Sequence, residues 1–486
     1  MSVDQKWLRE LVDRSTIGGD NESEELSVKI AYLEEEQFNS LEIASEEVAK
    51  AGQADDHHAM PKIQQVPFML RDNENFVKYF KPKLVSVGPY HHKDPNLKIT
   101  NPIKLKLAAN FIKETGVNKK TLYFDIKNQI KKFRDCYDNE ATKDYLDHEL
   151  AWIFLVDGCA ILQFMYISAD DHPKNSEKYL RKLGIKTDHV AFGQHDLFLM
   201  DNQLPYQLLQ LIMRSTSKEE DMFLQSIDKF IFDYTKAPGQ KYQKNDEILK
   251  DNHVHLLDLM RKILIQPRKN NKPTGCGEII INLTVDLFDK LKSNDKISEH
   301  WHSFRNMKEL RSAGIKLKPS ETSGVRDITF SGGTLKLPPI VVDESTAAKF
   351  LNMAAYEMCP DFQNDFEVSS YLCLMDVLIV DRAHEVKELR ENNILHNALG
   401  SDKEVATLFN EISTDLVPSE EIYLELKSHI EDYFNTIWLK WLRQVFQDLR
   451  DYFKGRWSLL AFIGAFLALA SSIIQTVYTV LGYHAG

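Results

Sequence analysis

Cysteine is scarce in this sequence, and basic residues are not in surplus. The five cysteines among 486 residues are widely spaced and form no C-x-x-C pair. Such an odd set encodes neither a disulfide framework nor a zinc ribbon, and it favours a reducing compartment. The chain carries 60 Lys and Arg against 72 Asp and Glu, a formal net charge of -12. This balance argues against a general nucleic-acid binder, which needs a basic surplus to displace counterions from phosphates.

The sequence also lacks the common motifs of catalysis and of nucleotide binding. It has no glycine-rich dinucleotide or phosphate loop, no H-E-x-x-H, no G-x-S-x-G and no kinase signature. The adjacent His91 and His92 lie in a loop rich in proline and glycine, where neighbouring imidazoles cannot easily reach one metal ion. Cys159 is a conceivable nucleophile, but its apolar neighbours favour inert packing. We therefore predict no enzyme, no cofactor, and no catalytic, cofactor-binding or metal-binding residues.

One further group of possible metal ligands is His253, His255 and Asp258. A helix that begins at His253 would place the two imidazoles on roughly opposite sides. Surface or capping roles are therefore favoured over a shared ion.

Charge is concentrated near the N-terminus. Between Asp20 and Asp56, twelve carboxylates occur with two lysines, a net charge of -10. Such a block predicts an acidic arm over residues 1–60 that is solvated and disordered, or that folds only on a protein partner with a basic surface. Ile30 and Leu41 fall close to one helical face, as partner-induced folding would require.

The C-terminus carries the longest uncharged segment. Residues 457–483 contain no Asp, Glu, Lys or Arg. As a helix, residues 459–481 span about 34 Å, enough for a hydrocarbon core of about 30 Å. Residues 1–15 mix acids and bases and hold no apolar signal-peptide core. We expect a single-pass, tail-anchored membrane protein with its transmembrane helix at 457–483, and a buried soluble helix is the alternative.

Residues beside and within this segment predict its orientation and assembly. The juxtamembrane segment 443–456 is basic, and no Lys or Arg follows Leu481. The positive-inside rule therefore predicts a cytosolic body on either the plasma membrane or an endomembrane. Gly464, Ala468 and Ser472 are spaced by four, which predicts a homo- or hetero-dimer through one helix face unless these small residues are incidental.

Residues 61–442 make up the main domain, and their pattern is mostly helical. Residues 150–167 are apolar, but Asp157 at their centre would cost about 2.5 to 3.5 kcal/mol in a bilayer, which favours a core helix. Residues 197–213 predict two short helices joined at Pro205. Residues 327–330 and 334–337 predict a hairpin. Apolar spacing of three or four predicts further helices at 103–113, 127–137, 220–234, 253–265, 285–291, 346–358, 370–389, 405–412 and 422–453. The expected fold class is mainly α: a large helical domain with a small β-hairpin element and one C-terminal transmembrane helix.

Six short motifs occur in a characteristic order. They are Val85–His92, Val156–Cys159, Asp201–Tyr206, Glu309–Ile315, Leu337–Ile340 and Leu399–Asp402. With the C-terminal segment, they make the chain resemble the plant family of domain of unknown function 247 from about residue 61 to residue 483. Departures are mild. Asn393 stands where the family often has Gly, and Asn tolerates the left-handed backbone that ends a helix.

The motifs themselves predict a scaffold, with a recognition pocket as the alternative. Gly88 and Pro89 fix a turn, because Gly accepts a positive φ and Pro locks its own. The amides of Asn202 and Gln203 can satisfy main-chain groups where a helix breaks.

The resemblance implies a plant-specific, membrane-anchored protein without assigned chemistry. Some grass members of the family are linked to pollen self-incompatibility, so recognition or signalling in self/non-self discrimination is the first hypothesis. An enzyme of unrecognised type that uses His91, His92 or Cys159 is the second. A structural membrane adaptor, whose acidic arm only keeps it soluble, is the third.

Overall fold

The chain divides into two compact units, Met1–Met60 and Pro61–Gly486. The computed structural model describes residues 29–45 apart from 31 and 35, and residues 60–436 apart from 73–74, 170–172, 217–219, 267–305, 364, 380–382 and 420. Residues 467–469, 471–472 and 475 are also described. In the first unit, the described residues between 29 and 45 are helical.

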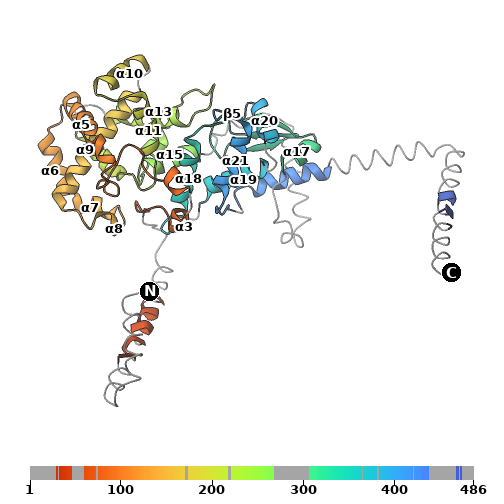
Figure 1. Cartoon of the computed structure of the whole chain (residues 1–486), viewed down its shortest axis with the longest axis horizontal. Helices are drawn as coiled ribbons and strands as arrows, with labels where there is room; N and C mark the ends of the chain where they lie inside the picture. The colour runs from red at the N-terminus through yellow and green to blue at the C-terminus, as the bar shows by residue number, and fades with distance from the viewer. Residues whose placement is uncertain are drawn as a thin grey trace, which may run out of the picture. The chain divides into compact units, whose positions relative to one another are not determined.

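The second unit is mainly helical, as predicted (Figure 1). Its earlier helices are α3 (Phe68–Arg71), α4 (Phe76–Tyr79), the 3-10 helix η1 (Leu97–Thr100), α5 (Asn101–Thr115), α6 (Lys119–Asn128), α7 (Ile130–Asp135), α8 (Asn139–Thr142), α9 (Asp147–Ser168), α10 (Pro173–Lys182), α11 (Thr187–Asp196), α12 (Tyr206–Arg214), α13 (Glu220–Thr235), α14 (Asp246–Lys250) and α15 (Leu256–Leu264). The later helices are α17 (Met307–Ser312), α18 (Thr346–Glu357), α19 (Glu367–Leu378), α20 (Ala383–Glu391) and α21 (Asp402–Ser413), and residues 424–436 are also helical.

Helix α9 is the centre of the earlier helices, which confirms the predicted core helix. It packs against α5, α6, α12 and α13, and most of its side chains are buried. Among the described residues, α9 is the one helix that is long and apolar enough to span a membrane. The Asp157 carboxylate on α9 accepts a hydrogen bond from Lys104 Nζ of α5 at 2.6 Å. This ion pair is how an acidic residue is accommodated inside an apolar helix.

The predicted hairpin is confirmed and extended by further strands. Strands β2 (Thr329–Ser331) and β3 (Thr334–Leu337) are antiparallel. Gly332 and Gly333 between them have φ values of 55° and 75°, the left-handed conformation that a two-residue hairpin turn of this type needs at both positions. Strand β1 (Lys316–Pro319) runs parallel to β3, and β4 (Ile340–Val342) pairs with β5 (Leu395–Asn397). We did not predict β1, β4 or β5, because three or four residues are too few to show an alternating pattern.

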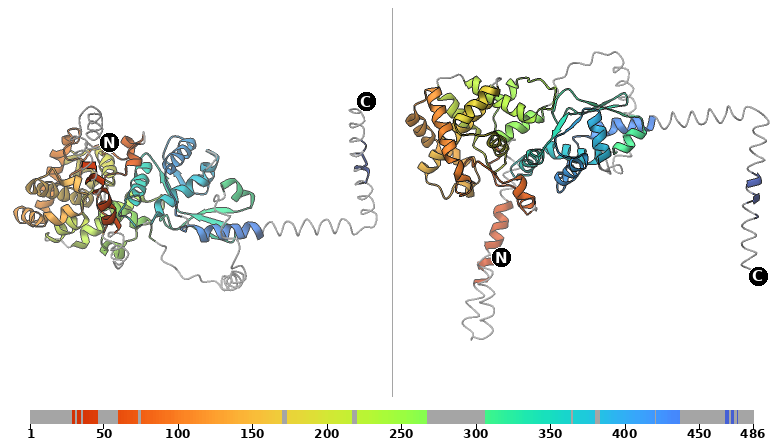
Figure 2. Two further views of the ribbon diagram at one scale, coloured as in Figure 1. Left: turned by 90° about the horizontal axis from the view of Figure 1, so that it is seen from below. Right: turned by 45° about the horizontal axis from the view of Figure 1, so that its top comes forward.

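Helix α18 connects the earlier helices to the later elements. It packs against α4 and α15 as well as against α19 and α21. In Figure 2 the orange-to-green helices before residue 265 and the teal-to-blue elements after residue 307 occupy different sides of this unit. Asn352 of α18 accepts a hydrogen bond from the Met200 N–H at 2.8 Å and donates one to the Tyr79 carbonyl at 2.9 Å. One buried amide therefore holds three distant segments together.

Several helix predictions need correction. Residues 197–205 are not helical, so the first of the two helices predicted around Pro205 is wrong. The cause is the set of side-chain hydrogen bonds described below for Asn202 and Gln203. The expected helix over 127–137 is divided at Gln129 between α6 and α7, and that over 370–389 is divided between α19 and α20. The helices expected at 103–113, 220–234, 346–358 and 405–412 are confirmed by α5, α13, α18 and α21.

Other predictions fall on residues outside those described. These are the helix at 285–291, residues 437–453, the basic segment 443–456, Gly464, and most of the segment 457–483. Within that segment, residues 467–469, 471–472 and 475, which include Ala468 and Ser472, are helical and exposed.

Candidate functional site

A buried carboxylate joins the start of the Val85–His92 motif to α11. Asp196 ends α11 and is fully buried. Its oxygens accept hydrogen bonds from the N–H groups of Lys83, Leu84 and Val85 at 3.0, 2.7 and 2.8 Å. A negative charge is unfavourable at the C-terminus of a helix, so three donors on one carboxylate are the compensation that this position requires. The segment that leads into Gly88 is thereby fixed to the end of α11.

The amides of Asn202 and Gln203 continue this bonding, which confirms their predicted scaffold role. Asn202 accepts from the Val87 N–H at 2.7 Å and donates to the carbonyls of Val85 and Asp196 at 3.0 and 2.8 Å. Gln203 donates to the carbonyls of Leu197 and Leu199, both at 2.8 Å, and accepts from the N–H of Leu257 in α15. These side chains replace the main-chain partners of a helix, which explains why residues 197–205 do not form one.

Gly88 is required by its surroundings as well as by its turn. Its φ is 68°, and a Cβ atom there would lie 2.7 Å from the Gln203 carbonyl oxygen and 3.0 Å from the Tyr137 hydroxyl. Its N–H donates to Asp157 at 3.1 Å. The predicted turn at Gly88 is thus confirmed. It lies between the Gln203 carbonyl, which it contacts closely, and Asp157, to which it is hydrogen-bonded.

The histidine pair in the loop after Gly88 is partly buried. His91 Nε2 lies 2.9 Å from the Asp201 carboxylate. His92 packs edge-on against the Tyr145 ring, and burial lowers the pKa of His92. Among the described residues, no three His, Cys, Asp or Glu side chains are arranged to hold a metal ion.

Cys159 is not placed for nucleophilic chemistry. Its side chain is fully buried on α9, and burial raises the pKa of its thiol to about 12. A thiol in such surroundings stays protonated, so packing is the role that the structure gives it.

His253 and His255 precede α15 and do not lie on it. Both are buried, so the predicted surface role is wrong, while the predicted capping role is confirmed for His255. His255 Nδ1 accepts from the Asp258 N–H at 3.0 Å, and the Asp258 carboxylate accepts from the Val254 N–H at 3.0 Å. Burial lowers the pKa of His255 to about 4. Because Nδ1 accepts the capping hydrogen bond, protonating Nδ1 would break the cap.

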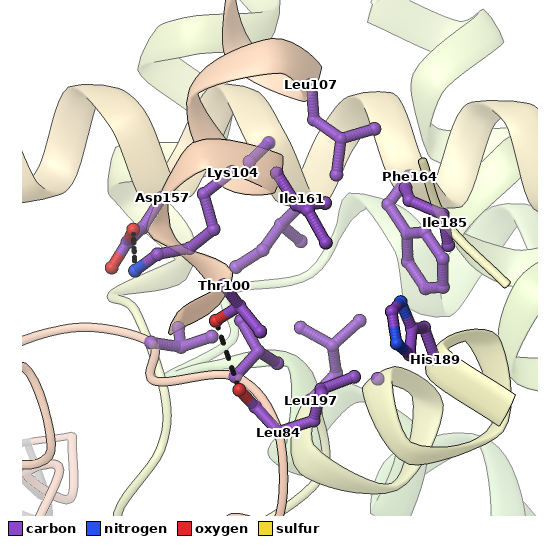
Figure 3. Close-up of a pocket in the computed structure, with 15 residues that line it drawn as sticks. Leu84, Thr100, Lys104, Leu107, Asp157, Ile161, Phe164, Ile185, His189 and Leu197 are labelled. Carbon is purple, nitrogen blue, oxygen red and sulfur yellow. Dashed lines mark hydrogen bonds and ion pairs between the residues drawn. The ribbon is translucent and has the colours of Figure 1, made fainter. Parts of the chain in front are cut away.

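A cavity that the sequence did not reveal lies beside the Lys104–Asp157 ion pair (Figure 3). Its volume is about 70 Å³. Most of the lining side chains come from the segment around Leu84, from α5, from α9 and from α11, and Thr100 of η1 and Ile185 complete them. The periodicity of a single segment could not indicate a cavity whose walls come from several.

Comparisons with known proteins show which family the chain belongs to. A family model described as DUF247, a plant protein of unknown function, matches residues 63–471. The chain belongs to this DUF247 family. It is 25% identical over 428 residues to the UPF0481 protein At3g47200 of Arabidopsis thaliana, covering 85% of this chain and 86% of that protein. It is 22% identical to the putative UPF0481 protein At3g02645 of the same plant, covering 82% and 86%. No solved structure matches significantly.

The first prediction concerns the amide at the centre of the DUF247 motif network. Asn202→Asp replaces an amide donor by a carboxylate that faces two carbonyl oxygens in a buried site. We expect the free energy of unfolding to fall by about 3 to 5 kcal/mol, the usual cost of an uncompensated buried charge. Urea denaturation followed by tryptophan fluorescence measures this loss.

Asn118→Asp is the matched control for this substitution. Asn118 is the N-cap of α6 and accepts hydrogen bonds from the N–H groups of Lys120 and Thr121, a role that Asp fills equally well. Its effect should lie within about 0.5 kcal/mol of zero. Equal losses for the two variants would show that the network does not determine the effect.

A second prediction follows from the His255 cap. The pKa of His255 is about 4 in the folded chain against an ordinary 6.5, so the unfolded state alone takes up a proton as the pH falls through this range. Stability is therefore fully present above pH 6.5 and declines toward pH 4, with a loss of about 2 kcal/mol by about pH 5.

His255→Asn isolates this contribution. Asn retains an N-cap acceptor but does not titrate. The free energies of unfolding of the full DUF247 chain and of the variant are measured by urea denaturation at about pH 7.5 and about pH 5. Between these two pH values the variant should lose about 2 kcal/mol less than the unsubstituted chain. If both lose the same amount, His255 does not contribute to the acid sensitivity.

Proposed function

We propose that this DUF247 protein is non-catalytic and membrane-anchored and acts in recognition or signalling, with self/non-self discrimination such as pollen self-incompatibility as its setting. The observation that carries the proposal is the helix of the first unit. Tyr32, Phe38 and Leu41 are 64%, 67% and 67% exposed on it, among carboxylates that include Glu34 and Glu42. Exposed aromatic and aliphatic side chains are the residues that anchor protein partners.

The motif network supports a scaffold role over catalysis. The polar groups of Asp196, Asn202 and Gln203 are directed to main-chain donors and acceptors inside the protein. These hydrogen bonds stabilise the fold of the surrounding main chain, and they leave few polar atoms free to bind a substrate. The runner-up proposal, an enzyme of unrecognised type, has one geometric observation in its favour: the partly exposed contact between His91 and Asp201.

The anchor is the second part of the proposal. Residues 457–483 carry no charged side chain, and the described residues Leu467 and Leu469 are helical and 62% and 64% exposed. We propose a cytosolic body, a basic juxtamembrane segment and a tail anchor that dimerises along the face of Gly464, Ala468 and Ser472.

Deleting residues 457–486 tests the anchor. The truncated chain should move from the membrane fraction to the soluble fraction in a flotation gradient, because the uncharged segment is the part that favours hydrocarbon. Deleting residues 1–60 is the control and should leave flotation unchanged. Membrane association that persists in the C-terminal truncation would mean that another segment binds the bilayer.

Exchanging residues 1–60 between two DUF247 proteins of different partner specificity tests the arm. Partner capture should follow the arm and weaken with salt, since charges are screened over about 8 Å at physiological ionic strength. Tyr32→Ser with Phe38→Ser should reduce capture at any salt concentration. Glu34→Gln with Glu42→Gln should mainly reduce the dependence on salt.

The opposite result favours the third hypothesis. If specificity stays with residues 61–442 and salt has no effect, the arm is a solubilising tail, and the chain is a structural membrane adaptor. A substitution of His91 that abolishes a measured activity while folding is intact would favour the enzyme.

A further inference from the structure

The cavity beside the Lys104–Asp157 ion pair has an apolar interior. Figure 3 shows Ile161 and Phe164 of α9, Leu107 of α5 and Leu197 around it. Its volume is about 70 Å³, more than the few tens of Å³ that one water molecule occupies. Protein interiors are close-packed, so an opening of this size in the middle of a helical core requires an explanation.

The polar groups around the cavity are engaged elsewhere. The single proton of the Thr100 hydroxyl is shared between two acceptors, the Leu97 carbonyl at 2.9 Å and the Leu84 carbonyl at 3.1 Å. Lys104 Nζ is occupied by Asp157 and by the Ser86 carbonyl at 2.8 Å. Water needs two to four polar partners to remain in a cavity. These walls offer few, so the cavity suits an apolar occupant.

One polar atom at the cavity is not satisfied. His189 Nδ1 is buried and has no hydrogen-bond partner in the part of the chain that the structure describes. His189 lies on α11, and its ring projects toward Phe164 in Figure 3. The accessible walls of the cavity are apolar, so this nitrogen is turned away from the open space and His189 lines the cavity with its ring carbon atoms.

The cavity opens on one side. Leu84, Ile103 and His189 are half-buried, whereas Leu107 and Phe164 are buried, so the first three form the mouth and the last two lie deeper. An elongated molecule can therefore place its apolar end inside while the rest extends past His189.

Gly193 keeps one wall of the cavity clear. It lies on α11, and the nearest atom to a Cβ placed there would be Phe164 at 3.7 Å, an ordinary contact distance. A larger side chain at this position would enter the cavity. Gly193 is therefore the position at which the space can be filled deliberately.

We propose that this cavity binds the end of an unbranched alkyl chain. The end of such a chain is apolar, as the accessible walls of the cavity are. Lys104, the cation at the cavity, is already paired with Asp157, so the walls offer no free charge to a charged ligand end. The alkyl chain of a free fatty alcohol and the acyl chain of a phospholipid share this chemistry.

Photolabelling of the full chain in vesicles tests the proposal and separates the two sources. One sample receives hexadecanol with a terminal diazirine, and the other receives phosphatidylcholine with the same diazirine at the end of an acyl chain. After illumination, labelled peptides are mapped by mass spectrometry. We expect label on the α9 peptide from at least one of the two reagents, and the reagent that labels identifies the source.

Gly193→Leu should reduce the label on α9 by about tenfold or more, because its side chain occupies the same space. Ala191→Leu adds the same side chain at an exposed position of α11 and should leave the label unchanged. Circular dichroism checks that each variant is folded.

Two results would overturn the proposal. One is the absence of label on α9 with both reagents, and the other is label that Gly193→Leu does not reduce. If Gly193→Leu does not fold, competition takes its place: excess unlabelled hexadecanol must suppress the label on the wild-type chain, and label that cannot be saturated counts against a site.

Discussion

A charged group inside an apolar helix can remain only if an opposite charge reaches it. In this chain Asp157 lies at the centre of α9, and Lys104 of α5 neutralises it at 2.6 Å. Both side chains are buried, so the loss of one partner would leave the other without compensation. The pair fixes which face of α5 meets α9. Because Asp157 also accepts from the Gly88 N–H, it holds the loop at Gly88 against α9.

The other buried hydrogen bonds of this region connect to the Lys104–Asp157 ion pair through the loop at Gly88. The loop that Asp157 holds at Gly88 is held at its start by Asp196 and in its middle by Asn202. Gln203 then connects the same region to the beginning of α15. In an interior of low polarity each of these groups needs all of its partners, so the arrangement stabilises one geometry and opposes alternatives. The cavity lies against this rigid side, which explains how an opening can persist there.

The sequence predicted those helices and turns whose formation depends on neighbouring residues in the chain. The apolar spacing located α5, α9, α13, α18 and α21, and the two glycines at 332–333 located the hairpin. Asn393 does adopt the left-handed conformation expected of it, with a φ of 56° after α20. Gly88 and the Asn202–Gln203 amides were predicted as scaffold because their chemistry has few other uses at a turn. The distant partners of the amides, such as Leu257 and Val85, could not be predicted, since they are 54 and 117 residues away. The cavity and the pairing of β4 with β5 depend on such distant contacts as well.

The position of Asn352 has a consequence for the order in which the chain matures. Its amide binds Tyr79 and the Met200 N–H, 273 and 152 residues earlier. During synthesis the earlier helices leave the ribosome long before α18 does, and their main-chain groups at these two points wait without the protein partner that will satisfy them. Contacts over such separations slow folding, because the ends of a long chain must be brought together first. The earlier helices therefore lack these two contacts until α18 has been synthesised.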